Sequence, residues 1–95
     1  MTDTLPRFIA LLVEHRPDKL SALGAAILAS VHFGICRDSR SFARVFGIAH
    51  ALVLRECVAL CEDQDLIELE NRKERSQRLF YALSPGGLSL IREAA

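Results

Sequence analysis

The densest group of side chains that could bind a ligand is a short basic segment between two apolar runs. Residues 71–78 read Asn-Arg-Lys-Glu-Arg-Ser-Gln-Arg and contain no large apolar side chain. Lysine and arginine side chains that neutralise phosphates release condensed counterions, so a protruding segment of this kind suits a nucleic-acid backbone. A solvated loop is the alternative, because charge alone says nothing about fold. The cations of the segment are Arg72, Lys73, Arg75 and Arg78.

Charge is segregated along a chain whose formal net charge is zero. Residues 62–70 contain five acidic side chains and no basic one, whereas residues 36–61 contain four arginines and two acids. A neutral sum can therefore conceal a basic face. The cations that could extend such a face beyond the basic segment include Arg40, Arg44 and Arg55.

Catalysis and metal binding are not indicated by the residue pattern. The serines, histidines and carboxylates form no triad or paired-acid motif, and no pair of ligands has the spacing of a structural zinc site. Cys57 and Cys61 share a helix face, and a thiol sensor assisted by Arg55 is one interpretation. We favour the other, in which they are small apolar residues of the core. The sequence thus predicts no enzyme, no metal and no cofactor.

The compartment expected for this chain is the reducing cytoplasm. Cys36, Cys57 and Cys61 are an odd number of cysteines, and the N-terminus lacks the pattern of a secretory leader. No apolar run approaches the roughly 20 residues that a membrane span needs. We therefore expect free thiols and no membrane association.

Helices and a hairpin must position these side chains, so we expect a mainly α fold with a small antiparallel β-hairpin. The apolar runs on either side of the basic segment predict the two strands. Asp18 and Ser39 are the expected N-caps of two helices, Gly34 and Gly47 the residues that end them, and Ser84 the N-cap of the last helix. The predicted helices cover about residues 5–15, 19–33, 40–46, 49–61 and 85–95, with a very short strand at 35–37.

The first helix is apolar most of the way round, which leaves two interpretations open. It packs on the core of its own chain, or it pairs with a second subunit. A single domain of 95 residues is marginally stable alone, and 51% of this one is hydrophobic, so part of its surface is expected to meet a partner. The candidate dimerisation residues are Leu5, Phe8, Ile9 and Leu12.

Three segments together resemble MarR-type winged-helix transcriptional regulators over residues 20–95. Residues 42–48 look like the core of a helix-turn-helix, residues 66–69 like the first strand of a wing, and residues 81–91 like the exit from the wing into the last helix. The resemblance implies a winged helix-turn-helix that binds double-stranded DNA as a homodimer. The helix from Ala49 would enter the major groove, and the tip at 72–78 would reach phosphates or a minor groove.

The start of the candidate recognition helix departs from that pattern. It reads Ala49-His50-Ala51-Leu52, Ala49 is a poor N-cap, and Leu54 is expected to face outward. Binding would then rest on phosphate contacts that are not base-selective. A winged-helix module that binds protein instead of DNA is the alternative, since fold does not decide function. A small-molecule effector site is not expected. The candidate DNA contacts are Arg40, Arg44, His50, Arg55, Arg72, Lys73, Arg75 and Arg78.

Overall fold

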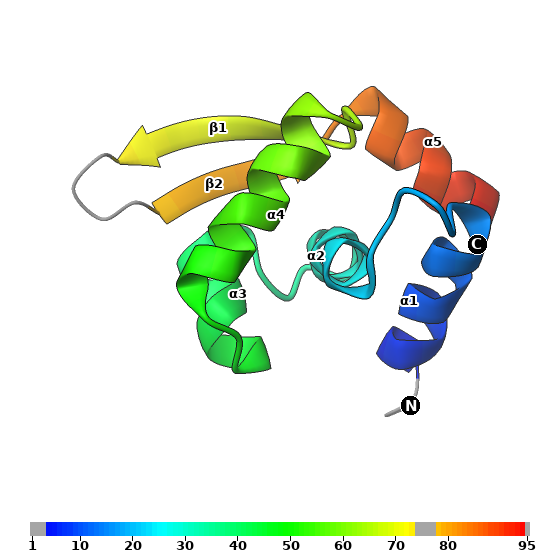
Figure 1. The fold of residues 1–95 in the computed structure, drawn as a ribbon, viewed down its shortest axis with the longest axis horizontal. Helices are drawn as coiled ribbons and strands as arrows, with labels where there is room; N and C mark the ends of the chain where they lie inside the picture. Colours follow the sequence, from blue (N-terminus) through cyan, green and yellow to red (C-terminus); the bar gives the residue numbers. More distant parts are fainter. Residues whose placement is uncertain (1–3, 74–77, 95) are drawn as a thin grey trace.

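Five helices and one two-stranded hairpin make up the part of the chain that the structure describes (Figure 1). The computed structural model describes residues 4–73 and 78–94, with backbone only for 71–73. Figure 1 shows α2 at the centre, α1 and α5 on one side of it, α3 and α4 on the other, and the hairpin projecting beyond α4. The expected mainly α fold with an antiparallel hairpin is confirmed. The elements are α1 (Thr4–His15), α2 (Ala22–His32), α3 (Ser39–Phe46), α4 (His50–Glu62), β1 (Ile67–Lys73), β2 (Arg78–Leu83) and α5 (Pro85–Ala94).

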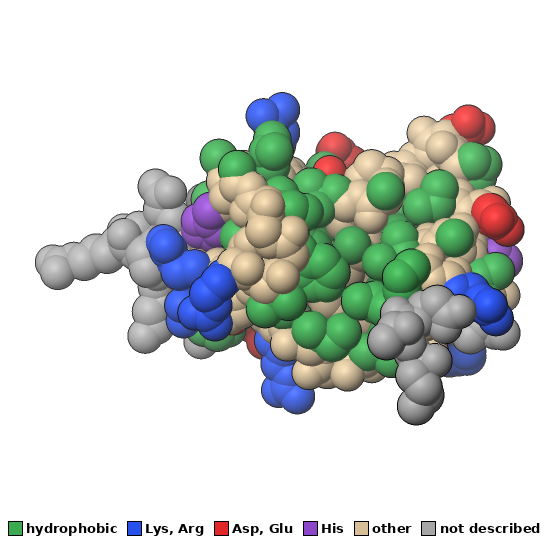
Figure 2. Space-filling view, turned by 90° about the horizontal axis from the view of Figure 1, so that it is seen from below, with side chains coloured by type: hydrophobic (Ala, Val, Ile, Leu, Met, Phe, Trp, Pro, Cys, Tyr) green, Lys and Arg blue, Asp and Glu red, His purple; other side chains and the backbone are tan. Residues whose placement is uncertain are grey.

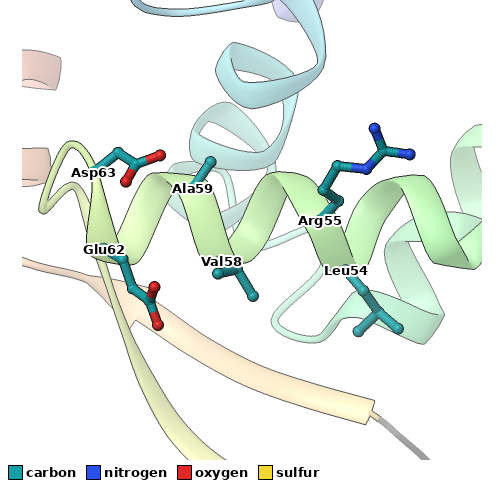
Figure 3. A pocket seen from close by; sticks show the side chains of 6 residues that line it. All are labelled: Leu54, Arg55, Val58, Ala59, Glu62 and Asp63. Atoms are coloured by element: carbon teal, nitrogen blue, oxygen red, sulfur yellow. The ribbon is translucent and has the colours of Figure 1, made fainter.

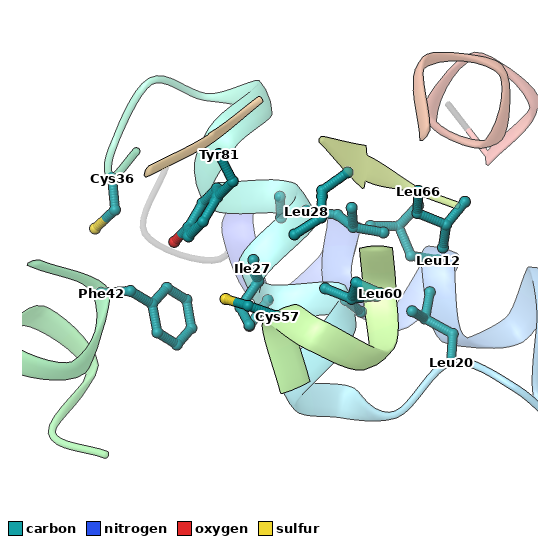
Figure 4. Close-up of a cluster of buried hydrophobic side chains, with 14 of the residues drawn as sticks. Leu12, Leu20, Ile27, Leu28, Cys36, Phe42, Cys57, Leu60, Leu66 and Tyr81 are labelled. Carbon is teal, nitrogen blue, oxygen red and sulfur yellow. The ribbon is translucent and has the colours of Figure 1, made fainter. Parts of the chain in front are cut away.

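The hydrophobic core draws side chains from every helix and from the hairpin (Figure 4). Helix α2 is buried over most of its length, and its small residues let neighbouring helices approach closely. A β-carbon on Gly24, for example, would lie 3.3 Å from Leu60 of α4. The fully buried side chains include Leu12, Ile27, Leu28, Phe42, Leu60, Leu66, Tyr81 and Leu90.

Helix α2 begins later than the sequence predicts. Its N-cap is Ser21, whose Oγ accepts a hydrogen bond from the backbone N–H of Gly24 at 3.0 Å. The prediction of Asp18 as N-cap was wrong, because the chain after α1 first makes a turn in which the Leu20 N–H donates to the Arg16 carbonyl. Leu20 precedes the helix and is nevertheless buried in the core.

Helix α3 is capped by Asp38 and not by the predicted Ser39. The Oδ2 atom of Asp38 accepts a hydrogen bond from the backbone N–H of Ser41 at 2.9 Å. Gly47 ends α3 with φ of +65°, and Gly34 follows α2 with φ of +71°, as predicted for left-handed residues after a helix. Helix α4 then begins without a side-chain cap at Ala49, also as expected.

The hairpin is longer than the sequence predicts, and its register shifts between Leu69 and Asn71. Residues 71–73 and 78 belong to strands, so much of the basic segment is strand and not loop. The predicted strand at 35–37 was wrong. Its place is taken by a single bridge between Asp38 and Phe80, beside a hydrogen bond from the Tyr81 N–H to the Arg37 carbonyl at 3.1 Å.

Helix α5 packs against both α1 and the hairpin. The Oγ of Ser84 accepts from the Gly87 N–H at 3.1 Å and donates to the Asp65 carbonyl at 2.6 Å, which caps the helix as predicted. Gly86 and Gly87 lie within its first turn. None of the helices within residues 4–73 and 78–94 has both the length and the apolar character required to cross a bilayer.

Candidate nucleic-acid interface

Asp38 and Ser39 join the start of β2, at the end of the hairpin away from α5, to the start of α3. The carboxylate of Asp38 caps α3 and also lies 3.3 Å from the Nε of Arg78 at the start of β2. The hydroxyl of Ser39 accepts a hydrogen bond from the Leu79 N–H at 3.0 Å. Two adjacent residues therefore hold the start of β2 against the N-terminus of α3. We call Asp38, Ser39, Arg78 and His50 the corner cluster.

The electrostatics of Asp38 follow from these contacts. Burial alone would raise the pKa of its carboxyl group, but hydrogen bonds from Ser41 and the nearby charge of Arg78 outweigh burial and lower that pKa. The carboxylate is therefore ionised at neutral pH. It holds the guanidinium of Arg78, which also lies over the ring of Phe80 at 5.8 Å from its centroid.

His50 brings the start of α4 into the same cluster. Its Nε2 lies 2.9 Å from the Oγ of Ser39. Since that oxygen already accepts from Leu79, its own proton is available to a neutral imidazole. Burial and the charges of Arg40 and Arg78 lower the pKa of His50, with only partial compensation by Asp38. His50 therefore fixes the start of α4 and offers no positive charge at pH 7.

Two exposed arginines lie beside the corner cluster. Arg40 and Arg44, one turn apart on α3, line a surface hollow of about 470 Å³ together with Ala43, Ile48 and His50. Figure 2 shows Lys and Arg side chains near the hairpin end of the molecule and hydrophobic side chains across the middle of the same face. The structure thus brings Arg40, Arg44 and His50 together, with Arg78 close by through Asp38.

Arg55 lies apart from that hollow. It lines a second groove, along the outward side of α4, and this groove ends at Glu62 and Asp63 (Figure 3). The side chains of Arg72 and Lys73, and the whole of Arg75, fall outside the described residues. Of the eight candidate DNA contacts, the structure therefore groups four around the start of α3. They are Arg40, Arg44, His50 and Arg78.

The outward apolar residue of α4 is Leu52, not Leu54. Leu52 is 46% exposed, whereas Leu54 is partly buried and packs against the core. The prediction that Leu54 faces outward was wrong, and Leu52 is exposed because the inward stripe of α4 runs through Val53, Cys57 and Leu60. Leu52 directly precedes Val53 in the sequence but does not belong to this stripe.

The candidate dimerisation residues of α1 serve the core of their own chain. Phe8 and Leu12 are buried, and Leu5 and Ile9 are partly buried against the same core. Phe8 also stacks on His32 with ring centroids 5.2 Å apart. For these residues the structure agrees with the first interpretation of the helix, and no second subunit is needed to cover them.

The cysteines behave as apolar residues. Cys36 and Cys57 are buried, and burial together with the nearby Glu56 raises the pKa of Cys57 to about 12. Its thiol is therefore protonated at neutral pH and a poor nucleophile. Within the described residues, no three His, Cys, Asp or Glu side chains gather closely enough to hold a metal ion.

Sequence reasoning identified Arg40, Arg44 and His50 but missed Asp38 and Ser39 as the residues that organise them. The residue types at the start of a helix indicate which residue caps it. They do not show that Ser39 would be fully buried against a strand 40 residues later.

Comparisons of the chain with protein-family models, with curated proteins and with solved structures each found no match. The functional interpretation therefore depends on the geometry of the corner cluster and of α4.

Proposed function

We propose that this chain is a winged-helix protein that binds double-stranded DNA as a homodimer and regulates transcription. Helices α3 and α4 would form the helix-turn-helix, and the hairpin would form the wing. The observation that carries the proposal is the position of Arg40 and Arg44, both exposed around one hollow beside the corner cluster. Such a pair of cations suits neighbouring phosphates of a duplex.

The corner cluster supports this proposal by fixing the hairpin relative to both helices. Ser39 contacts the start of β2 and the start of α4 through one oxygen atom. A wing held in this way can reach the duplex backbone while α4 lies in the adjacent groove. The cations at 72–75 would then add phosphate contacts at the tip.

The charge distribution of α4 decides which part of it would approach DNA. Arg55 lies in the second turn, whereas Glu62 ends the helix and Asp63 follows it. Recognition helices read bases mainly through their N-terminal residues, so the acidic end would point away from the duplex. Because Leu52 and Arg55 are the only large exposed side chains in the first two turns, binding should depend mainly on phosphates and discriminate little between sequences.

The test replaces Arg40 and Arg44 by alanine and measures affinity for a mixed-sequence duplex over a range of salt concentrations. Each lost phosphate contact should reduce the slope of log affinity against log salt by about 0.9, so the double variant should lose about 1.8. A matched control replaces Lys19 and Arg92, two exposed cations away from α3, and should leave the slope unchanged. Wild-type protein without any salt-dependent duplex binding would rule the proposal out.

A second candidate function is a winged-helix module that binds a protein. Exposed apolar side chains near the end of α3 and the start of α4 favour it, since Val45 is 56% exposed and Leu52 46%. Replacing Leu52 by aspartate separates the two functions. A protein-binding module should lose its partner, whereas a phosphate-driven DNA binder should be affected less.

A further inference from the structure

The groove on the outward side of α4 has the form of a helix-packing site. It lies between two rows of side chains with a spacing of four residues (Figure 3). One row consists of Leu54, Val58 and Glu62, and the other of Arg55, Ala59 and Asp63. The groove measures about 550 Å³. Rows with this spacing are the ridges that fit into the corresponding groove of a second helix.

Charge is arranged along this groove so that one end complements the other. Arg55 lies at one end and the acids Glu62 and Asp63 at the opposite end, all three exposed. Between them the groove is apolar, with the partly buried Val58 and the small Ala59. Arg55, Glu62 and Asp63 form no ion pair with one another or with any other residue that the structure describes.

We propose that this groove binds α4 of a second copy of the chain, with the two helices antiparallel. A two-fold axis between Val58 and Ala59 would place Arg55 of each copy beside the acidic end of the other. Two-fold contacts require such a self-complementary surface. If one residue of the first copy contacts a second residue of the other copy, the reverse contact forms as well. A parallel pairing would instead bring arginine against arginine and acid against acid, so the charges select the antiparallel arrangement.

The size of the contact sets the strength of this association. Two crossing helices bury much less than the roughly 1,200 Å² of standard interfaces, so the dimer should be weak and should form only at high protein concentration. Its ion pairs would be exposed to solvent, so it should also weaken as salt is added. The self-association does not depend on the proposed function. Its consequence does: if α4 enters DNA, the α4 dimer and the DNA complex exclude each other.

The test is sedimentation equilibrium of the full chain over a wide range of protein concentration. Arg55→Glu and Glu62→Arg should each weaken the dimer at least about tenfold, because each brings like charges together. The double variant, Arg55→Glu with Glu62→Arg, should restore association close to that of the wild type. Arg92→Glu, an exposed change on α5, is the control and should have no effect. Circular dichroism verifies that each variant is folded.

A wild-type chain that stays monomeric at every concentration would overturn the inference. If no associated form of the chain, including any that builds on a homodimer through α1, responds to either charge change, the inference is overturned too, since α4 would then take no part in association. The double variant also separates this inference from the proposed function. It should recover self-association but not affinity for duplex DNA, because its positive charge has moved to the end of α4 away from the DNA.

Discussion

At the residue scale, one hydroxyl oxygen connects three elements. The Oγ of Ser39 accepts from the backbone of β2 and contacts the imidazole of His50, while Ser39 itself begins α3. The neighbouring Asp38 binds Arg78. Arg40 and Arg44 are the exposed cations of the hollow beside the cluster, whereas His50 is neutral and Arg78 is paired with Asp38.

The lowered pKa of His50 predicts a pH dependence of stability. Burial and nearby arginines keep this imidazole neutral, so the unfolded chain, with an ordinary pKa of about 6.5, binds the proton more readily than the folded chain. The free energy of unfolding should therefore fall as the pH drops below about 6.5 and level off below the folded pKa. In urea titrations between about pH 7 and pH 5, His50→Gln should show a smaller fall than the wild type. Equal falls in both proteins would contradict the assignment.

Tyr81 predicts a substitution that does not destabilise. It is 1% exposed, and its hydroxyl has no hydrogen-bond partner among the described residues. Burying an unpaired hydroxyl costs about 1–3 kcal/mol, so Tyr81→Phe should leave the free energy of unfolding unchanged or raise it by up to about 1 kcal/mol. Tyr81→Ala, which empties the same site, should cost about 3–5 kcal/mol. A loss of more than about 1 kcal/mol in Tyr81→Phe would indicate a partner for the hydroxyl.

At the element scale, the sequence predicts where helices end better than where they begin. Gly34 and Gly47 end two helices because each has a positive φ that other residues adopt at a cost. Asp18, Ser21, Asp38 and Ser39 are all competent N-caps by type, and only the path of the chain selects Ser21 and Asp38.

The candidate site could be predicted from the sequence in part. Arg40 and Arg44 follow from composition and helical spacing, because residues four apart share a helix face. The sequence did not show that Leu52, and not Leu54, is the exposed residue. Helix α4 is apolar on several sides, so tertiary packing decides which side faces the core. The joining of the start of β2 to α3 did not follow either. It depends on contacts between residues about 40 positions apart.

The junction between the hairpin and α5 gives a prediction about an element. A β-carbon on Gly87 would overlap the carbonyl oxygen of Leu66, which is backbone and cannot move aside. Gly87→Ala should therefore lower the free energy of unfolding by about 3 kcal/mol or more. Gly47→Ala is the matched control, because space is open there and only the positive φ is strained, at a cost of about 1–2 kcal/mol. Urea unfolding of both variants gives the comparison, and a Gly87 variant as stable as the Gly47 variant would refute the overlap.

At the scale of the whole molecule, the two ends of the chain close one side of the fold. Helix α1 packs against α2 and α5, so the first and last helices complete a core that the central elements cannot cover alone (Figure 1). The homodimer of the proposed function would use the outer side of α1. The residues available for it include Leu11, which is 38% exposed, more than Phe8 or Leu12.

Leu12 tests whether α1 serves the core or a second subunit. Its side chain is fully buried within one chain, so Leu12→Ala should lower the free energy of unfolding by about 2–5 kcal/mol. That loss should be the same at low and high protein concentration, because stability that comes from a partner rises with concentration. Leu11→Ala, one position along the same helix, should change stability by less than about 0.5 kcal/mol in the monomer. Thermal unfolding of both variants at widely different protein concentrations gives the measurement. A loss in Leu12→Ala that depends on protein concentration would mean that α1 is covered by a second subunit after all.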